Sequence, residues 1–218
     1  MIPDKIKAVI FDVDGLIIDS EPTWMQVHDE FIARHQLSIE EKYKETFRGI
    51  GLKELVEELK RKFALPESVE ELLSEYRELF YKQFFVSGKA KLIVGVEECA
   101  RVLYAKGYQL AVATGGHDGS KMKQILESFN LLKYFPIVVS SDEVKRGKPD
   151  PEVFLTTAEK LGVAPAACLV LEDSVNGVRA GKAAGMLVFG INMSDKLYRQ
   201  LQANGADKVF HQISEISL

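Results

Sequence analysis

The chain has 218 residues, of which 46% are hydrophobic and 28% are charged, and this composition excludes disordered, collagenous and coiled-coil chains. Its 28 Lys and Arg residues against 32 Asp and Glu residues leave a net charge of −4, which argues against binding of nucleic acid. Two distant cysteines, Cys99 and Cys168, cannot form a disulfide framework or a structural zinc site. No apolar run reaches the length of a membrane span. We therefore expect a cytoplasmic protein without a membrane anchor, and a monomer.

The first predicted element is a short buried strand. Residues 6–11 are mostly apolar and β-branched, and the run ends in Asp12-Val-Asp-Gly15, where acidic residues and a glycine end a strand. From residue 21 to about residue 88 the apolar residues instead recur at helical spacing. This second stretch predicts a small antiparallel bundle of helices.

Helix start signals support the predicted bundle. Pro22 suits the first turn of a helix, because proline has no backbone N–H to donate there. Ser38 with Glu41, and Ser68 with Glu71, have the spacing of capping boxes, in which each side chain accepts the other residue's backbone N–H. Each of the three signals marks the start of a predicted helix.

Strands and helices alternate after Ala90. We expect strands at residues 109–114, 137–141, 168–172, 187–191 and 208–210. We expect helices at residues 96–106, between residues 114 and 137, at 151–161, before Gly185 and near Leu197. The helix at 151–161 has Asp150 as its expected N-cap. Alternation of this kind predicts an α/β fold, a Rossmann-like parallel sheet with helices on both faces, and the strands are too few for an eightfold barrel.

The helical bundle interrupts the α/β pattern after its first strand. We therefore expect a catalytic core domain made of residues 1–15 and 91–218, and a small helical cap domain made of residues 16–90.

Polar residues occupy the ends of several predicted strands. In open α/β sheets, ligands bind beyond the carboxyl ends of the strands, so residues at these ends are candidates for a shared site. They are Asp12 and Asp14, then Thr114 with Gly115 and Gly116, then Glu172 and Asp173, with Lys148 in a loop between a strand and a helix. Three such strand ends and a lysine together favour a functional site over chance surface turns.

Familiar ion- and nucleotide-binding loops do not explain these residues. A calcium loop starting at Asp12 would need glycine at its sixth position and glutamate at its twelfth, but Gly15 is fourth and Thr23 is twelfth. The chain has no phosphate-binding GxxxxGK[ST] loop. Gly49 and Gly51 lack the third glycine and the preceding strand of a dinucleotide site.

Phosphoryl transfer suits the set of residues better. A carboxylate can attack phosphorus and form an acyl phosphate. The amides of Gly115 and Gly116, ahead of a helix, can meet phosphate oxygens. Carboxylates gathered with a phosphate carry an excess of negative charge, which Lys148 and Mg²⁺ would offset, and Mg²⁺ prefers carboxylate and phosphate oxygens.

The motifs together resemble those of the haloacid dehalogenase superfamily, in its β-phosphoglucomutase-like subgroup. The resemblance covers essentially the whole chain and rests on Asp12-Val-Asp-Gly-Leu16, Thr114, Gly147-Lys-Pro-Asp-Pro151, Glu172-Asp173 and Asp19-Ser-Glu-Pro22. It implies that Asp12 is the nucleophile and Asp14 the general acid and base, and that Thr114 and Lys148 hold the phosphoryl group. It also implies that Mg²⁺ is held by Asp12, the Asp14 carbonyl and Asp173, with Glu172 in its outer shell. Asp14 favours phosphate esters, because dehalogenases that resemble this fold lack the second acid.

The predicted cap departs from true β-phosphoglucomutases. By motif alignment, Trp24 stands at the place of their cap histidine and Leu52 at the place of an arginine for a second phosphate. His117 begins a His-Asp pair where they have Lys-Asn. A mutase must bind a phosphate at both ends of its substrate, and here only Arg48 and Lys53 lie near the expected place. We therefore expect a Mg²⁺-dependent phosphatase acting on small phosphomonoesters, with a sugar phosphomutase as the alternative.

Three further residues are candidates for substrate contact, namely Trp24 and Arg48 in the cap and His117 after Thr114. The sequence leaves the phosphate ester itself open. Receiver-type signalling domains also combine an acidic pair with a phosphorylated aspartate, a threonine and a lysine, so a phospho-aspartate switch is the hypothesis from another class. Such domains are about half as long and have no helical insertion after their first strand.

Overall fold

A computed structural model describes residues 2–44, 47, 51–86 and 91–218 of the chain. These residues form two compact units. The first unit comprises Met1–Ile18 and Leu92–Leu218, and the second comprises Asp19–Lys91. The division of the protein into a catalytic core and a cap stays a proposal about what the two units do.

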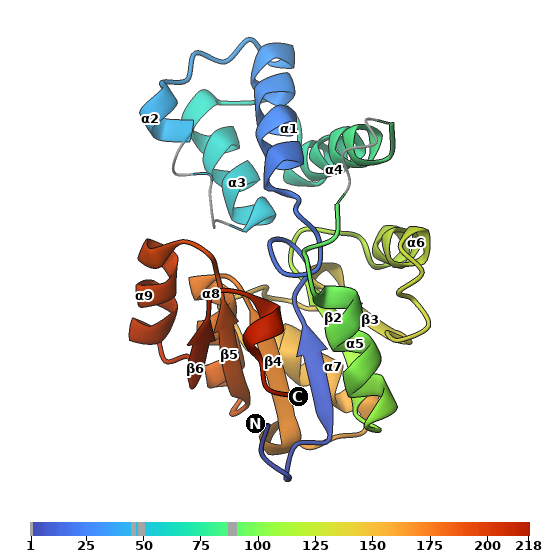
Figure 1. Ribbon diagram of the computed structural model, residues 1–218. Helices are drawn as coiled ribbons and strands as arrows, with labels where there is room; N and C mark the ends of the chain where they lie inside the picture. Colours follow the sequence, from blue (N-terminus) through green and yellow to red (C-terminus); the bar gives the residue numbers. More distant parts are fainter. Residues whose placement is uncertain (1, 45–46, 48–50, 87–90) are drawn as a thin grey trace. The chain divides into compact units, whose positions relative to one another are not determined.

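The first unit is built on a parallel sheet (Figure 1). Its order is β3-β2-β1-β4-β5-β6, the order of a doubly wound Rossmann-type sheet, so the expected fold class is confirmed. The strands are β1 (Ala8–Phe11), β2 (Gln109–Thr114), β3 (Ile137–Ser140), β4 (Cys168–Glu172), β5 (Leu187–Ile191) and β6 (Lys208–Phe210). Parallel pairing demands crossovers, and helices provide them between consecutive strands after β2.

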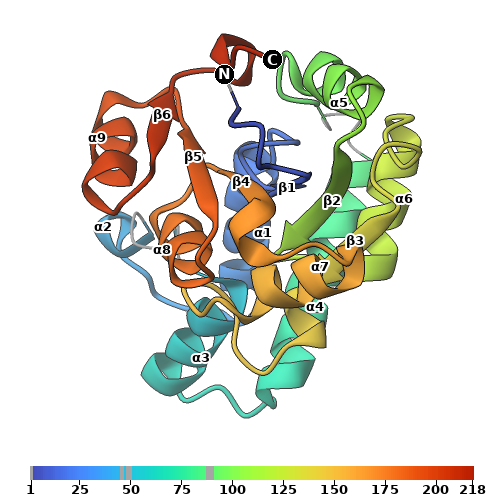
Figure 2. The ribbon, with the colours of Figure 1, turned by 90° about the horizontal axis from the view of Figure 1, so that it is seen from below.

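Helices cover both faces of this sheet. They are α5 (Val96–Ala105), α6 (Gly119–Ser128), α7 (Glu152–Leu161), α8 (Val175–Ala183) and α9 (Asp195–Ala203). Figure 2 shows α7 and α8 on one side of the sheet and α5 on the other. Successive side chains of β1 point to opposite faces of the sheet. Ile10 therefore packs in the apolar cluster that includes residues of α7 and α8. Phe11 points the other way and packs edge-on against Phe135, with ring centroids 5.0 Å apart.

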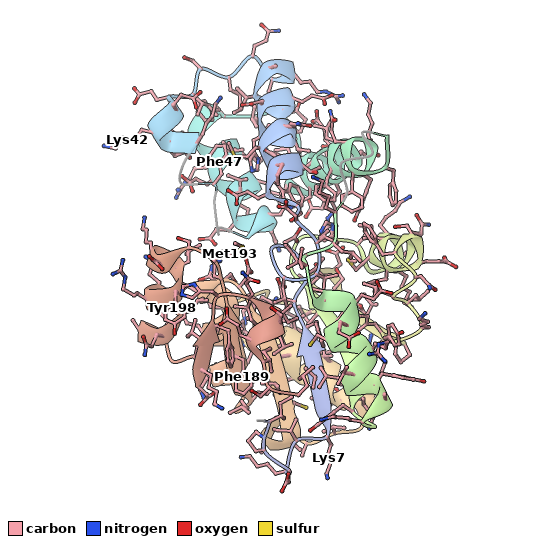
Figure 3. The ribbon with its side chains drawn as sticks, in the orientation of Figure 1. Lys7, Lys42, Phe47, Phe189, Met193 and Tyr198 are labelled. Carbon is pink, nitrogen blue, oxygen red and sulfur yellow. The ribbon has the colours of Figure 1, made fainter. Side chains whose placement is uncertain are left out.

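At the β6 edge the core is aromatic. Phe189 on β5 is buried and packs edge-on against Phe210 on β6, with ring centroids 5.6 Å apart. Tyr198 lies on α9 and stacks on His211. Phe189 and Tyr198 are labelled in Figure 3. These contacts attach the last helix and strand to the sheet.

The second unit is helical, as predicted. It contains α1 (Glu21–Arg34), α2 (Glu41–Lys44), α3 (Leu52–Phe63) and α4 (Val69–Val86). Helix α4 packs against both α1 and α3. Phe31 of α1 stacks on Tyr76 of α4 with ring centroids 4.1 Å apart, and both side chains are fully buried. Across the described ranges of both units, no helix combines the length and the apolar character that a membrane span requires.

Two of the three helix start signals in this unit are confirmed. Pro22 lies in the first turn of α1. Ser68 and Glu71 form the reciprocal capping box, because the Ser68 N–H donates to Glu71 Oε2 at 2.8 Å and the Glu71 N–H donates to Ser68 Oγ at 3.2 Å. The box predicted at Ser38 is wrong. The first carbonyl that accepts a helical N–H of α2 is that of Glu40, so the helix begins two residues later than its sequence signal.

Predicted boundaries in the first unit also shift. The strand expected at 6–11 begins at Ala8, and the helix expected at 96–106 ends at Ala105. The strand expected at 137–141 ends at Ser140, because Ser140 caps a short 3-10 turn by accepting the Asp142 N–H. The helix expected at 151–161 begins at Glu152. Asp150 does accept the Glu152 N–H through Oδ1 at 3.1 Å, but Pro151 occupies the N-cap position.

A buried histidine makes the stability of the second unit depend on pH. Burial lowers the pKa of His28 to about 4, with the nearby Asp29 opposing the shift. The unfolded chain takes up a proton on His28 below about pH 6.5, whereas the folded chain does so only near pH 4. We therefore expect the contribution of His28 to the free energy of unfolding to be complete above pH 6.5. This contribution should fall as the pH drops toward 4, by up to about 3 kcal/mol.

Chemical denaturation of wild type and His28→Leu at pH 7 and pH 4.5 measures this contribution. The variant is expected to lose less stability between the two values than the wild type. His211→Leu, at a side chain that is 45% exposed, is the control and should follow the wild type. Identical pH dependence of His28→Leu and wild type would contradict the prediction.

Candidate active site

The candidate site lies where three neighbouring strands end. Asp12 directly follows β1, Thr114 is the last residue of β2 and Glu172 is the last residue of β4. Strand β1 pairs with both β2 and β4, so these residues meet at one edge of the sheet. Asp12 continues the ladder, because its N–H donates to the Leu171 carbonyl at 3.0 Å. This edge flanks the point where the strand order reverses, which is where open α/β sheets bind ligands.

Lys148 joins two of these strand ends. Its ammonium Nζ donates to Asp12 Oδ1 at 2.5 Å, to Glu172 Oε1 at 2.6 Å and to the Ala113 carbonyl at 3.2 Å. All three charged side chains are nearly or fully buried. Burial alone would lower the pKa of Lys148, but the charges of Asp12 and Glu172 raise it above its ordinary value. The lysine therefore places a permanent positive charge beside Asp12.

Glu172 is held on both sides. Its Oε2 accepts the Ser174 N–H and the Ser174 hydroxyl, each at 2.9 Å. Ser174 in turn caps α8 by accepting the Gly177 N–H at 3.1 Å. Both oxygens of Glu172 are therefore engaged, one by Lys148 and one by Ser174, which suits a residue that orients its neighbours.

Gly177 allows this close approach of α8 to Glu172. A Cβ at residue 177 would lie 1.8 Å from Glu172 Oε1, so even alanine has no room there. We expect Gly177→Ala to displace the Glu172 carboxylate, to destabilise the fold by ~1–3 kcal/mol and to lower kcat/KM about 100-fold. Thermal unfolding and a phosphatase assay measure the two effects. Gly51→Ala is the matched control, because a Cβ there meets no described atom within 4 Å, and normal activity of Gly177→Ala would refute the prediction.

Asp173 lies beside Glu172 and close to the turn that follows β1. Gly15 has a φ of +77°, and a Cβ on it would lie 2.1 Å from Asp173 Oδ2, so both the backbone and the space require glycine. The Asn192 side-chain amide donates to the Asp173 carbonyl at 3.3 Å. These contacts fix Asp173 at the same edge as Asp12.

Asp12, Glu172 and Asp173 can hold a cation together. Among the described residues, they form a group whose carboxylate oxygens lie within 4.8 Å of one another. Burial, with a contribution from Glu172, raises the pKa of Asp12 to about 7. Burial, followed by the charges of Asp12 and Glu172, raises the pKa of Asp173 well above its usual range. The lysine alone leaves the carboxylates in repulsion, so a hard divalent cation such as Mg²⁺ fits both the charge and the oxygen donors.

Asp14 lies close to His117 at the same edge of the sheet. Its Oδ1 is 3.1 Å from His117 Nε2, and its side chain is 30% exposed. The His117 side chain is fully buried, and its backbone carbonyl accepts the Ser140 hydroxyl at 2.6 Å. Contact of His117 with substrate, expected from the sequence, stays a prediction.

Thr114, Gly115 and Gly116 lead from β2 toward α6, as expected. Thr114 is fully buried, and among the described residues its hydroxyl has no hydrogen-bond partner. Ser141 Oγ donates to the Thr114 carbonyl at 3.3 Å and so fixes the end of the strand. A buried hydroxyl of this kind can donate to an oxygen of a bound phosphoryl group.

The two cap candidates belong to the second unit, and their contact with the substrate stays a prediction. Trp24 lies on α1 in the second unit and packs on Phe80, with ring centroids 4.3 Å apart. Arg48 lies outside the described residues, as does Gly49. Asn192 was missed by the sequence reasoning, although it follows β5 directly and could have been found by the same rule that singled out Asp12.

Comparison with known proteins agrees with the motifs. The family of haloacid dehalogenase-like hydrolases matches residues 9–191. The phosphorylated carbohydrates phosphatase of Thermotoga maritima is 32% identical over 191 residues, which cover 85% of each chain. Hexitol phosphatase B of Escherichia coli strain K12 is 33% identical over 191 residues, which cover 84% of this chain and 82% of that protein.

Solved structures show the same fold. The structure of β-phosphoglucomutase from Clostridium difficile superposes with a TM-score of 0.82 at 20% identity and covers 98% of this chain and 94% of that one. The expected resemblance to the haloacid dehalogenase superfamily is confirmed by the family match, and the shared fold is that of a β-phosphoglucomutase. The family match spans all the motifs from the strand before Asp12 to the strand after Asp173. The chain therefore belongs to the family of haloacid dehalogenase-like hydrolases.

Proposed function

We propose that this hydrolase is a Mg²⁺-dependent phosphatase that cleaves small phosphomonoesters through a phosphorylated Asp12. The observation that carries the proposal is the position of Lys148, whose ammonium bridges Asp12 and Glu172 across neighbouring strands. A nucleophilic carboxylate needs such a cation beside it, since it must approach a phosphate that is itself negatively charged.

Mg²⁺ is the metal that the oxygen donors favour. Asp12 and Asp173 would hold it, together with the Asp14 carbonyl, and Glu172 would support them from behind. When bound, Mg²⁺ would neutralise charge on the phosphoryl oxygens and hold the nucleophile and the phosphate in one orientation.

Asp12 is proposed to attack the phosphorus in line with the ester oxygen, which leaves with a proton from Asp14. Lys148, the Thr114 hydroxyl and the amides of Gly115 and Gly116 offset the charge on the transferring group. In the second half of the reaction Asp14 takes a proton from water, and that water displaces Asp12 from the phosphorus. Free phosphate and an alcohol are the products.

Sugar phosphates and related metabolites are the proposed substrates. The two relatives are named for phosphorylated carbohydrates and for hexitols, and each matches more than four fifths of this chain. Trp24 and Arg48 stay candidates for contacts that select the substrate.

A panel of sugar phosphates, polyol phosphates and nucleotide monophosphates tests the function. Phosphate release is measured with Mg²⁺, after chelation with EDTA and after Mg²⁺ is added back. We expect sustained release over many turnovers, which is lost on chelation and restored by Mg²⁺. No release from any ester, or release that EDTA leaves unchanged, would contradict the proposal.

The same assay separates the alternatives. β-Glucose 1-phosphate with a bisphosphate primer tests for a mutase, and isomerisation faster than hydrolysis would favour that function. The fold shared with β-phosphoglucomutase makes this test necessary. Release that stops at about one equivalent per chain would instead indicate a phospho-aspartate switch.

A further inference from the structure

The backbone of His117 is held by a side chain at the end of β3, and its ring reaches the acid that follows β1. Its carbonyl accepts the hydroxyl of Ser140, the last residue of β3, at 2.6 Å, and both residues are buried. Its ring nitrogen Nε2 lies 3.1 Å from Oδ1 of Asp14, which is 103 residues away in the sequence. The side chain therefore spans from the β2–α6 loop to the turn after β1.

This arrangement limits where the Asp14 carboxyl can point. Asp14 is 30% exposed and lies in a turn in which the Gly15 N–H donates to the Ile18 carbonyl at 2.9 Å. A carboxyl on a turn can rotate about its χ angles, and each wrong rotamer removes the acid from the ester oxygen. A hydrogen bond from a buried, anchored side chain selects one rotamer in advance.

We infer that His117 is a positioning residue that holds Asp14 in the orientation needed to protonate the leaving group. The inference rests on the proposed function, because it takes Asp14 as the general acid. It assigns His117 a role different from the substrate contact expected from the sequence. A fully buried ring on a backbone that Ser140 holds suits this role better than contact with a substrate that must enter and leave.

Two variants of His117 distinguish the contact with Asp14 from the mere presence of a polar side chain. In His117→Gln, the glutamine amide lies about as far from the backbone as Nε2 of histidine, so it can still donate to Asp14. In His117→Asn, the side chain is polar but too short to reach Asp14. Both variants keep a hydrogen-bonding side chain in the buried position, so they differ chiefly in the contact under test.

Leaving-group dependence is the readout. Glycerol phosphate has an alcohol that leaves only when protonated, whereas para-nitrophenyl phosphate has a leaving group that departs as an anion. For His117→Asn we expect kcat/KM to fall on the order of 10–100-fold for glycerol phosphate and less than about threefold for para-nitrophenyl phosphate, with His117→Gln restoring most of the loss. KM should change little, because the residue does not hold the substrate.

Two reference variants complete the test. Asp14→Asn should show the same dependence on the leaving group, with a larger loss. Met122→Ala removes a buried side chain from α6 and should lower the melting temperature without changing the ratio of the two kcat/KM values. It controls for a general loosening of this region.

The outcomes distinguish the inference from the proposed function. If Asp14→Asn shows leaving-group dependence but His117→Asn lowers both rates equally, or only raises KM, the positioning role is wrong and the phosphatase stands. If Asp14→Asn affects both esters equally, Asp14 is not the general acid and the inference fails, while the phosphatase stands. If the wild type releases phosphate from no ester of the panel, the proposed function fails and the inference fails with it.

Discussion

Asp12→Asn is expected to reduce phosphate release from every ester by at least about 10³-fold, because the amide cannot attack phosphorus. The chain is expected to fold normally, since an amide fills the same space and can still accept a hydrogen bond from Lys148 at Oδ1. The measurement is kcat/KM with Mg²⁺, together with a thermal unfolding curve. A folded variant without activity would show that Asp12 takes part in the reaction rather than only supporting the fold.

The control for this variant is Asp195→Asn. Asp195 lies on α9 with a side chain that is 84% exposed, so the same chemical change there should leave the activity unchanged. Turnover by Asp12→Asn equal to that of the wild type, in a preparation shown to be free of contaminating phosphatase, would refute both the nucleophile and the proposed mechanism.

Lys148→Met should affect both activity and stability. Removing the ammonium leaves the fully buried Glu172 without its charged partner, which we expect to cost about 3–5 kcal/mol of stability. The loss of positive charge beside Asp12 should lower kcat/KM on the order of 10²–10³-fold. Denaturant unfolding without added Mg²⁺ and steady-state kinetics with Mg²⁺ measure the two effects separately.

A double variant separates the two effects. Lys148→Met combined with Glu172→Gln removes the unpaired buried charge, so it should recover much of the lost stability. It should not recover activity, because the positive charge is still absent. If the double variant is no more stable than Lys148→Met, Glu172 is not the partner whose burial makes Lys148 necessary to the fold.

The positions of the strands could be predicted because their signals are local. Residues 6–11, 109–114 and 168–172 are apolar runs that polar residues end, and each corresponds to a strand of the structure. The limits of the local signals appear at Ser38 and Ser140. At both positions a glutamate follows the serine by three residues, but only Ser140 forms a cap. Ser140 caps a 3-10 turn, and the predicted strand therefore ends there.

The candidate site could be predicted as a set of residues but not as a set of contacts. Asp12 and Glu172 were singled out because each stands at the end of a strand, which is a property of a few neighbouring residues. Their common attachment to Lys148 joins positions 136 and 24 residues apart, and no local pattern contains it. The requirement for glycine at residue 177 likewise depends on a side chain from another element.

The sequence by itself determined which chemical groups stand at the carboxyl ends of the strands, because hydrophobic periodicity and strand-ending residues act over a few positions. Only the tertiary structure decided which of these groups touch. Strand pairing brings Asp12 beside Glu172, and the Ser140 hydroxyl fixes the backbone of the loop from which His117 reaches Asp14. The physical reason is that hydrogen bonds and charge pairs act over about 3 Å in space, whatever the distance along the chain.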